Sequence, residues 1–368
     1  MNPKKIFLYL PLAALVLTIG CGDGELPTAV QQPQEVHSLF TSTPPVIDGR
    51  DDDAAWQRAT PYKVFLNNTR GGSNLPDDGL LIEFSSTWWK VSVVDTAAGD
   101  TSEVIYVGLL ATWEDNDKNL QRRMWQFDPT NAEWKQTNTG SDWLVLVWIG
   151  AARNTDIWYW DAATTNPMGY FDDMVLEGIT VVDEVEPLLL RIDDLNYFND
   201  TPDNRNTWDE NYDDNLTPGD PSDDHPKFAW NFDPATVPPS LPPVFSDNNE
   251  AGLFLLASEA DLLRNSPIAG KNEAVEVPGF VLEQPMGGAA DVRAYGRYEN
   301  GRWTLEFYRR ATGSNTSDVV LNPEARFFSQ LFAVAIGDNT LSPFDRDADP
   351  VTVSDATQLT FEFIFEDE

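Results

Sequence analysis

Cysteine and histidine are nearly absent from this chain of 368 residues, and both shortages exclude kinds of chemistry. The one cysteine, Cys21, cannot form a disulfide within the chain. The two histidines, His37 and His225, are too few for a histidine-rich metal site, and they argue against a histidine-based catalytic triad. No two carboxylates stand out by their spacing as a glycosidase pair. The sequence therefore indicates a protein that is not an enzyme.

Basic residues are scarce as well. The chain has 24 Lys and Arg against 60 Asp and Glu, so its formal net charge is −36. A surface with this charge repels phosphate groups, which argues against nucleic acid and against charge-driven binding to anionic membranes. Hydrophobic residues nevertheless make up 41% of the chain and include 13 tryptophans, far too apolar a composition for a disordered acidic chain. We therefore expect a folded core.

The N-terminus carries an apolar run that is too short to span a membrane comfortably. Lys4 and Lys5 precede an uncharged run that continues to Gly20, directly before Cys21. The ending Thr-Ile-Gly-Cys is similar to the cleavage box of bacterial lipoproteins. We expect residues 1–20 to be a lipoprotein signal peptide and Cys21 to carry the lipid, with a plain signal peptide and an incidental cysteine as the alternative. The predicted location is the bacterial cell envelope, periplasmic or outer-surface, with the lipid as the only membrane contact.

Two segments lack the patterns of a folded core. Residues 21–43 are polar and without periodicity, which predicts a flexible tether. Residues from about 196 to 250 are rich in Asp, Asn and Pro, and proline removes the donors that a central strand needs. We interpret the second segment as a long acidic insertion in a domain of residues 44–368, with a domain boundary as the alternative.

The rest of the chain shows strand-length segments between turn signals, and long helical periodicity is nearly absent. Trp303, Leu305 and Phe307 alternate with polar residues, and Asn300-Gly301 before them is typical of a β-hairpin turn. Other strand candidates are residues 80–84, 104–111, 143–150, 252–257, 331–337 and 359–365. This pattern predicts an all-β fold, an antiparallel β-sandwich.

Several motifs of the predicted sandwich resemble known domains. Residues 44–56, PPVIDGRDDDAAW, resemble the opening strand of sandwiches related to family 9 carbohydrate-binding modules. Later motifs follow, in order, the pattern of the haem-binding domain of the ethylbenzene dehydrogenase gamma subunit and related cytochromes; they are residues 122–136, 141–150, 156–170, 277–313 and 332–339. The resemblance implies a haem-binding β-sandwich with an electron-transfer role and a redox partner protein.

The iron ligands of that family have no counterparts here. Its haem is either c-type, bound through Cys-x-x-Cys-His, or b-type with axial Met and Lys. No cysteine follows Cys21, which excludes the c-type motif. The family methionine position corresponds to Trp148 and its neighbours, and no lysine follows Lys271 where the family lysine lies.

The resemblance also predicts where a haem would lie. It puts Trp158, Tyr159 and Trp160 on the pocket wall. The remaining candidates for an iron ligand are Met168, Met286 and His225. Of these, Met168 is preferred, because its thioether lies in the turn directly after the wall strand.

Aromatic residues suggest a second class of function. Exposed tryptophans would form a stacking platform for sugar, and the candidates are Trp88, Trp89, Trp158, Trp160, Trp208 and Trp230. On this view the protein is a surface module without haem that binds carbohydrate or another protein. Core packing is the alternative, because Trp158 and Trp160 point to one face of a strand with Tyr159 opposite, and large aromatic side chains are mostly buried.

Three acidic residues at alternate positions, Asp345, Asp347 and Asp349, suggest a calcium site. This spacing can turn several carboxylate oxygens toward one ion, although Pro350 stands where an EF-hand loop has glycine. A solvated acidic loop is the alternative, since the pattern is short and the chain is very acidic.

Overall fold

Strands dominate the computed structural model, which describes residues 34–66, 80–95, 100–149, 154–177, 196–199, 208–216, 222–234, 236, 254–313, 318–321, 323, 331–340 and 361–366. The one α-helix among these residues is α1 (Ala54–Arg58), and the other helical segments are short 3-10 turns. None of the helices in this part of the chain has the length and apolarity needed to cross a bilayer. The predicted all-β class is confirmed.

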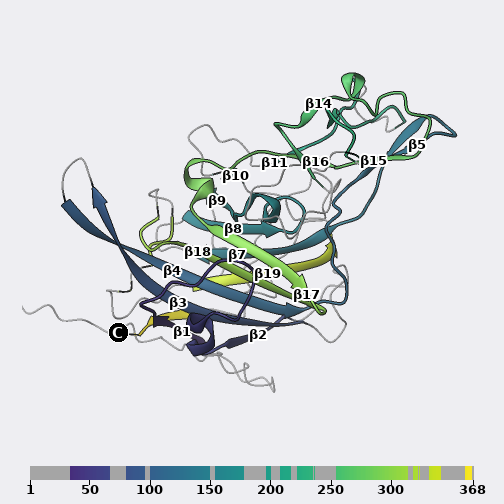
Figure 1. Ribbon diagram of the computed structural model, residues 1–368. Coiled ribbons are helices and arrows are strands. Elements are labelled where there is room, and N and C mark those ends of the chain that lie inside the picture. Colours follow the sequence, from purple (N-terminus) through teal and green to yellow (C-terminus); the bar gives the residue numbers. More distant parts are fainter. Residues whose placement is uncertain are drawn as a thin grey trace, which may run out of the picture. The chain divides into compact units, whose positions relative to one another are not determined.

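The larger sheet has seven strands (Figure 1). In order these are β17 (Arg293–Glu299), β18 (Arg302–Arg310), β4 (Asp100–Glu114), β3 (Leu80–Asp95), β1 (Gln34–Phe40) and β20 (Phe361–Phe365), with β2 (Tyr62–Leu66) also paired to β3. Asn300 and Gly301 connect β17 to β18 with positive φ angles, so the predicted hairpin is confirmed. The sheet is antiparallel except at β1, which runs parallel to both β3 and β20.

Strand β1 corrects the predicted tether of residues 21–43. Its inward side chains Val36 and Ser38 are buried, and the Ser38 hydroxyl accepts a 2.8 Å hydrogen bond from Ser86 on β3. Its outward His37 lies 2.9 Å from the Glu366 carboxylate. The alternation is hidden in the sequence because the buried face includes a serine rather than a run of apolar residues. The sheet therefore begins at Gln34.

A buried carboxylate attaches residues 48–50 to the larger sheet. Glu306 on β18 accepts hydrogen bonds from the backbone amides of Asp48, Gly49 and Arg50 at 2.6–3.2 Å and from the Trp56 indole at 2.6 Å. Burial raises the pKa of Glu306 to about 7, although these four donors lower it. The segment that resembles the opening of a carbohydrate-binding sandwich is thus held by one side chain of a distant strand.

The second sheet faces the first. It contains, in order, β10 (Asn196–Asn199), β9 (Asp172–Glu177), β8 (Asn154–Asp161), β7 (Ser141–Ile149) and β19 (Leu331–Thr340), all antiparallel. Trp158 and Trp160 of β8 pack across the core on Phe307 and Trp303 of β18, with ring centroids 6.2 and 5.1 Å apart. This shared core confirms the β-sandwich.

Gly296 is required where the two sheets approach each other. A Cβ at this position would overlap the Trp160 indole. Its amide donates a 2.7 Å hydrogen bond to the Asn166 side-chain oxygen, which also accepts one from the Trp160 indole. This contact fixes the turn after β8, with the 3-10 segment η1 (Asn166–Met168), against β17.

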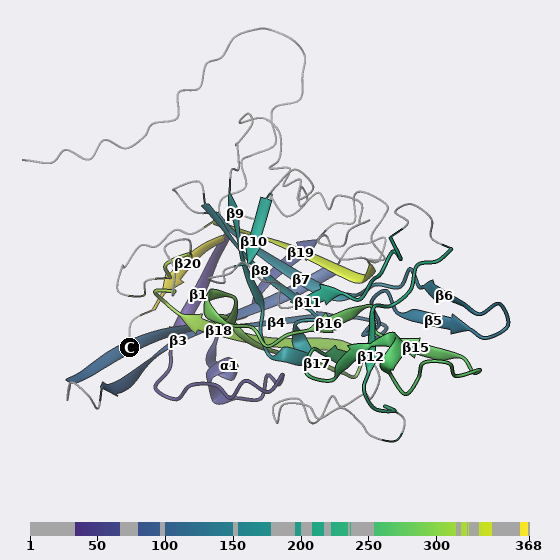
Figure 2. The same cartoon turned by 90° about the horizontal axis from the view of Figure 1, so that it is seen from above.

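The outer face of the second sheet is also covered (Figures 1 and 2). Its side chains pack against Trp208 of the insertion and Phe280 of a later strand. The covering elements form one small sheet of β11 (Trp208–Glu210), β16 (Phe280–Leu282) and β13 (Leu255–Leu256). Two further small sheets belong to a separate core with Trp125 and Trp230; they are β12 (Phe228–Trp230) with β14 (Ala260–Leu262), and β15 (Val275–Val277) with β5 (Trp125–Asp128) and β6 (Glu133–Gln136). The acidic insertion therefore contains strands and core residues where the structure describes it.

Candidate functional site

The strand predicted to form the haem wall is packed on both faces. The side chains of Trp158, Tyr159 and Trp160 on β8 are all fully buried. The two tryptophans belong to the core between the sheets, and Tyr159 belongs to the core on the outer face. The Tyr159 hydroxyl donates to Asp161 at 2.7 Å and accepts from Arg122 at 3.0 Å. Core packing, the alternative to a ligand-binding role for these tryptophans, is confirmed.

The described residues around β8 do not fit a haem. Trp148, at the family methionine position, is itself buried, with its ring centroid 4.8 Å from that of Trp158. Met168 is buried and belongs to the outer-face core that also contains Tyr159 and Tyr170. Met286 precedes the 3-10 segment η5 (Gly287–Ala290) and is 56% exposed. Iron ligation by either methionine stays a prediction.

The predicted sugar platform does not form either. All six candidate tryptophans are at most 6% exposed, namely Trp88, Trp89, Trp158, Trp160, Trp208 and Trp230. Trp208 and Trp230 show that the acidic insertion, which we expected to lack core residues, contributes a ring to each of two cores. None of the six presents a free face for a sugar.

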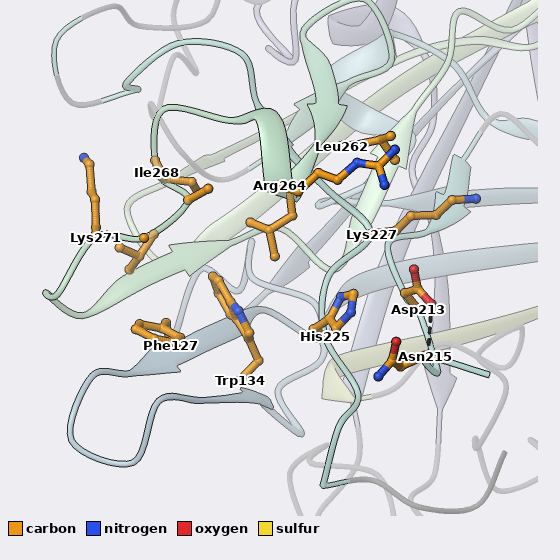
Figure 3. A pocket seen from close by; sticks show the side chains of 14 residues that line it. Phe127, Trp134, Asp213, Asn215, His225, Lys227, Leu262, Arg264, Ile268 and Lys271 are labelled. Carbon is orange, nitrogen blue, oxygen red and sulfur yellow. Dashed lines mark hydrogen bonds between the residues drawn. The ribbon is translucent and has the colours of Figure 1, made fainter. Parts of the chain in front are cut away.

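A cleft of about 540 Å³ lies instead beside the small sheets (Figure 3). Phe127 and Trp134 of the β5–β6 hairpin form one wall. The other lining residues come from the insertion, which includes His225, and from residues 262–275. The cleft thus brings together three segments that are far apart in the sequence. Among the candidate iron ligands, His225 is the one that lines it.

The imidazole of His225 is held in one orientation. Its Nδ1 lies 3.1 Å from the carbonyl oxygen of Pro226. Because a carbonyl only accepts, Nδ1 must carry the proton, and Nε2 is then an acceptor in the neutral ring. The backbones of His225 and Asp213 exchange hydrogen bonds of 2.9 and 3.1 Å, which fix this part of the insertion. Nε2 is therefore the nitrogen that remains to meet a ligand.

The structure contains two buried charge clusters that the sequence patterns did not predict. In the first, the buried Arg309 guanidinium of β18 lies 3.0 Å from Asp156, 3.6 Å from Asp173 and 3.6 Å from Asp318. Burial and the neighbouring Asp156 raise the pKa of Asp173 well above its ordinary value. The signal in the sequence is weak: single aspartates beside apolar strand residues.

The second cluster contains Asp115, Asp142 and Asp338, with carboxylate oxygens within 4.8 Å of one another. Asp142 accepts hydrogen bonds from the Asn119 amide at 2.8 Å and from the Trp303 indole at 3.0 Å. Burial, with Asp115 nearby, raises the pKa of Asp142 to about 8. Burial also raises the pKa of Asp338 to about 6. These carboxyls are therefore partly protonated near neutral pH.

The remaining predicted sites lie outside the described residues. They are the lipidation site Cys21 and the calcium candidates Asp345, Asp347 and Asp349. Lipid attachment and calcium binding at these positions stay predictions.

Comparison with known proteins identifies the family. The sequence profile described as ethylbenzene dehydrogenase matches residues 148–340, just over half of the chain. The match begins at the end of β7 and includes β8, the cleft residues of the insertion, the β17–β18 hairpin and β19. No curated protein matches the chain. This chain belongs to the ethylbenzene dehydrogenase family.

Proposed function

We propose that this protein is a lipid-anchored, non-catalytic binding module of the bacterial cell envelope, acting beside an electron-transfer chain. It keeps the sandwich of a haem-binding family but not that family's iron-ligand set. The observation that carries the proposal is the packing of β8, whose Trp158, Tyr159 and Trp160 are buried on both faces. Axial ligands hold a haem iron and set its potential, so we expect a different role for a chain that lacks them and whose wall strand is packed on both faces.

The second candidate is an electron-transfer component that carries haem itself, with a redox partner protein. Family membership favours it, because the resemblance implies haem. Its iron ligand would be Met168, Met286 or His225.

An absorption spectrum distinguishes the two candidates. We expect protein purified from haem-supplying cells to show no Soret band, because described side chains pack on both faces of β8. A Soret band with an α band in the reduced form would contradict the proposal. The variants Met168→Leu, Met286→Leu and His225→Gln then identify the ligand. Leucine removes the thioether with little change in volume, so a lost band in those variants reports ligation rather than misfolding.

Membrane attachment depends on Cys21 in this proposal. We expect Cys21→Ser to release the protein from membranes into the soluble fraction, because the lipid is its only predicted membrane contact. Cell fractionation and mass spectrometry of the mature N-terminus measure this. Wild type that is wholly soluble and carries no lipid in its native host would disprove the anchor.

A further inference from the structure

The cleft beside the small sheets has the size of a small-molecule site. Its volume of about 540 Å³ lies within the range of roughly 300–1,000 Å³ that is usual for such sites. Apolar side chains from the β5–β6 hairpin and from residues 262–275 form much of its lining, with a few polar groups between them (Figure 3). The charges of those polar groups decide which class of ligand it favours.

The cleft reverses the charge balance of the chain. Acidic residues outnumber basic ones by 60 to 24 in the whole sequence. The cleft, by contrast, is lined by three cations, Lys227, Arg264 and Lys271, against one carboxylate, that of Asp213. A cleft lined mainly by one sign of charge focuses the field and concentrates ligands of the opposite sign. The site therefore favours an anion, which the rest of this acidic surface repels.

Two of the three cations have no ion-pair partner among the residues that the structure describes. Lys271 is already compensated, because its ammonium lies 3.1 Å from the Asp233 carboxylate. Within the described part of the chain, Lys227 and Arg264 form no ion pair. Figure 3 shows these two side chains on the same side of the cleft, with Lys271 on the opposite side. Each can donate hydrogen bonds to a carboxylate, and arginine suits carboxylates through its planar fork.

An aromatic wall accompanies these cations. The partly buried Trp134 ring packs on Phe127 with ring centroids 5.1 Å apart at 50°. Both rings border the cleft, and the buried Ile268 adds apolar surface. Figure 3 shows the rings of Trp134 and His225 beside the same space. An indole face binds the flat or apolar side of another ring, and His225 Nε2 is placed to bond a polar substituent.

We propose that this cleft binds a small carboxylate that carries a ring. Lys227 and Arg264 hold the carboxylate and the ring lies on Trp134. Where the ring carries a hydroxyl group, His225 Nε2 accepts a hydrogen bond from it. The inference rests on the proposed function and names the class of ligand that the binding module takes. An acidic sugar and an aromatic acid share this chemistry, so the test must separate them.

The test is a titration of the mature full-length protein with D-glucuronate and with benzoate, followed by calorimetry and tryptophan fluorescence at low ionic strength. D-glucose and benzyl alcohol are the neutral counterparts. We expect saturable binding of at least one carboxylate, about tenfold or more tighter than its neutral counterpart. The double variant Lys227→Met with Arg264→Met should lose about tenfold or more in affinity, since both side chains are exposed and their loss leaves the core unchanged. Lys63→Met, on β2 of the larger sheet and 60% exposed, is the matched control and should bind like wild type.

Each outcome decides the inference. Preference for glucuronate identifies a sugar acid and preference for benzoate an aromatic acid, and both support it. The inference is overturned if neither carboxylate shows saturable binding at concentrations up to about 10 mM, where a site with a Kd near 1 mM would be mostly filled. Equal affinity for the neutral counterparts, or unchanged affinity in the double variant, also overturns it. A Soret band would contradict the proposed function and not this inference, so the two failures are distinguishable.

Discussion

Arg309→Met is expected to lower the free energy of unfolding by about 3–5 kcal/mol, the usual cost of removing one partner from a buried ion pair. The Arg309 guanidinium is fully buried and lies within 3.6 Å of Asp156, Asp173 and Asp318. It also donates a 2.8 Å hydrogen bond to the Val319 carbonyl and lies 5.0 Å from the Trp158 ring centroid. Methionine fills part of the space but leaves carboxyl groups buried without a positive charge.

Urea denaturation at pH 7 measures this effect, with Arg310→Met as the control because Arg310 is the exposed neighbour on the same strand. The loss should be smaller at pH 5, where the abandoned carboxyls take up protons more easily. Adding Asp156→Asn and Asp173→Asn to Arg309→Met should restore part of the stability. A change below about 1 kcal/mol at pH 7 would mean that the cluster is hydrated, as in an exposed salt bridge.

Asp142→Asn is expected to reduce the pH dependence of stability. The ordinary pKa of this carboxyl is 3.8, and burial raises it to about 8 in the folded protein. Between these values the folded protein keeps a proton that the unfolded chain has released. Stability therefore falls as pH rises from about 4 to about 8, and the loss is complete above the folded pKa. Between pH 6 and pH 9, wild type should lose about 3 kcal/mol more than the variant.

Asparagine suits this position because it resembles the protonated acid. Its oxygen can accept from the Asn119 amide and the Trp303 indole, as Asp142 does. Urea denaturation over this pH range is the measurement, and Glu133→Gln on the exposed β6 is the control. Parallel stability curves for wild type and Asp142→Asn would show that Asp142 is ionised in the folded protein at neutral pH.

Local patterns predicted the parts of the fold that depend on local geometry. Side chains alternate across a strand, so Trp303, Leu305 and Phe307 were assignable to one face before their partners were known. Asn300-Gly301 predicted its hairpin because both residues adopt positive φ easily. Strand β1 was missed because its partners, β3 and β20, lie far along the chain.

The sites depended on long-range contacts. The alternation in β8 correctly assigned Trp158 and Tyr159 to opposite faces of the strand. No local pattern, however, shows that a third layer covers the outer face of the second sheet. The preferred ligand Met168 was chosen for its place in the sequence, and the structure packs it in a core. Trp134 was not predicted as a site residue, because an aromatic residue in a hairpin has no local pattern that indicates a cleft.

By itself, then, the sequence determined the all-β class, the strong negative charge, the absence of an internal disulfide and of a c-type haem motif, and the resemblance to a haem-binding family. These features follow from the composition, from the spacing of apolar residues and from the order of the motifs. None of them depends on contacts between distant segments. Only the tertiary structure decided that the predicted haem wall is core, that Arg309 gathers three aspartates, and that Lys227 and Arg264 meet Trp134 at one cleft. Burial and ion pairing depend on which strands become neighbours, and that is settled by packing among segments up to hundreds of residues apart.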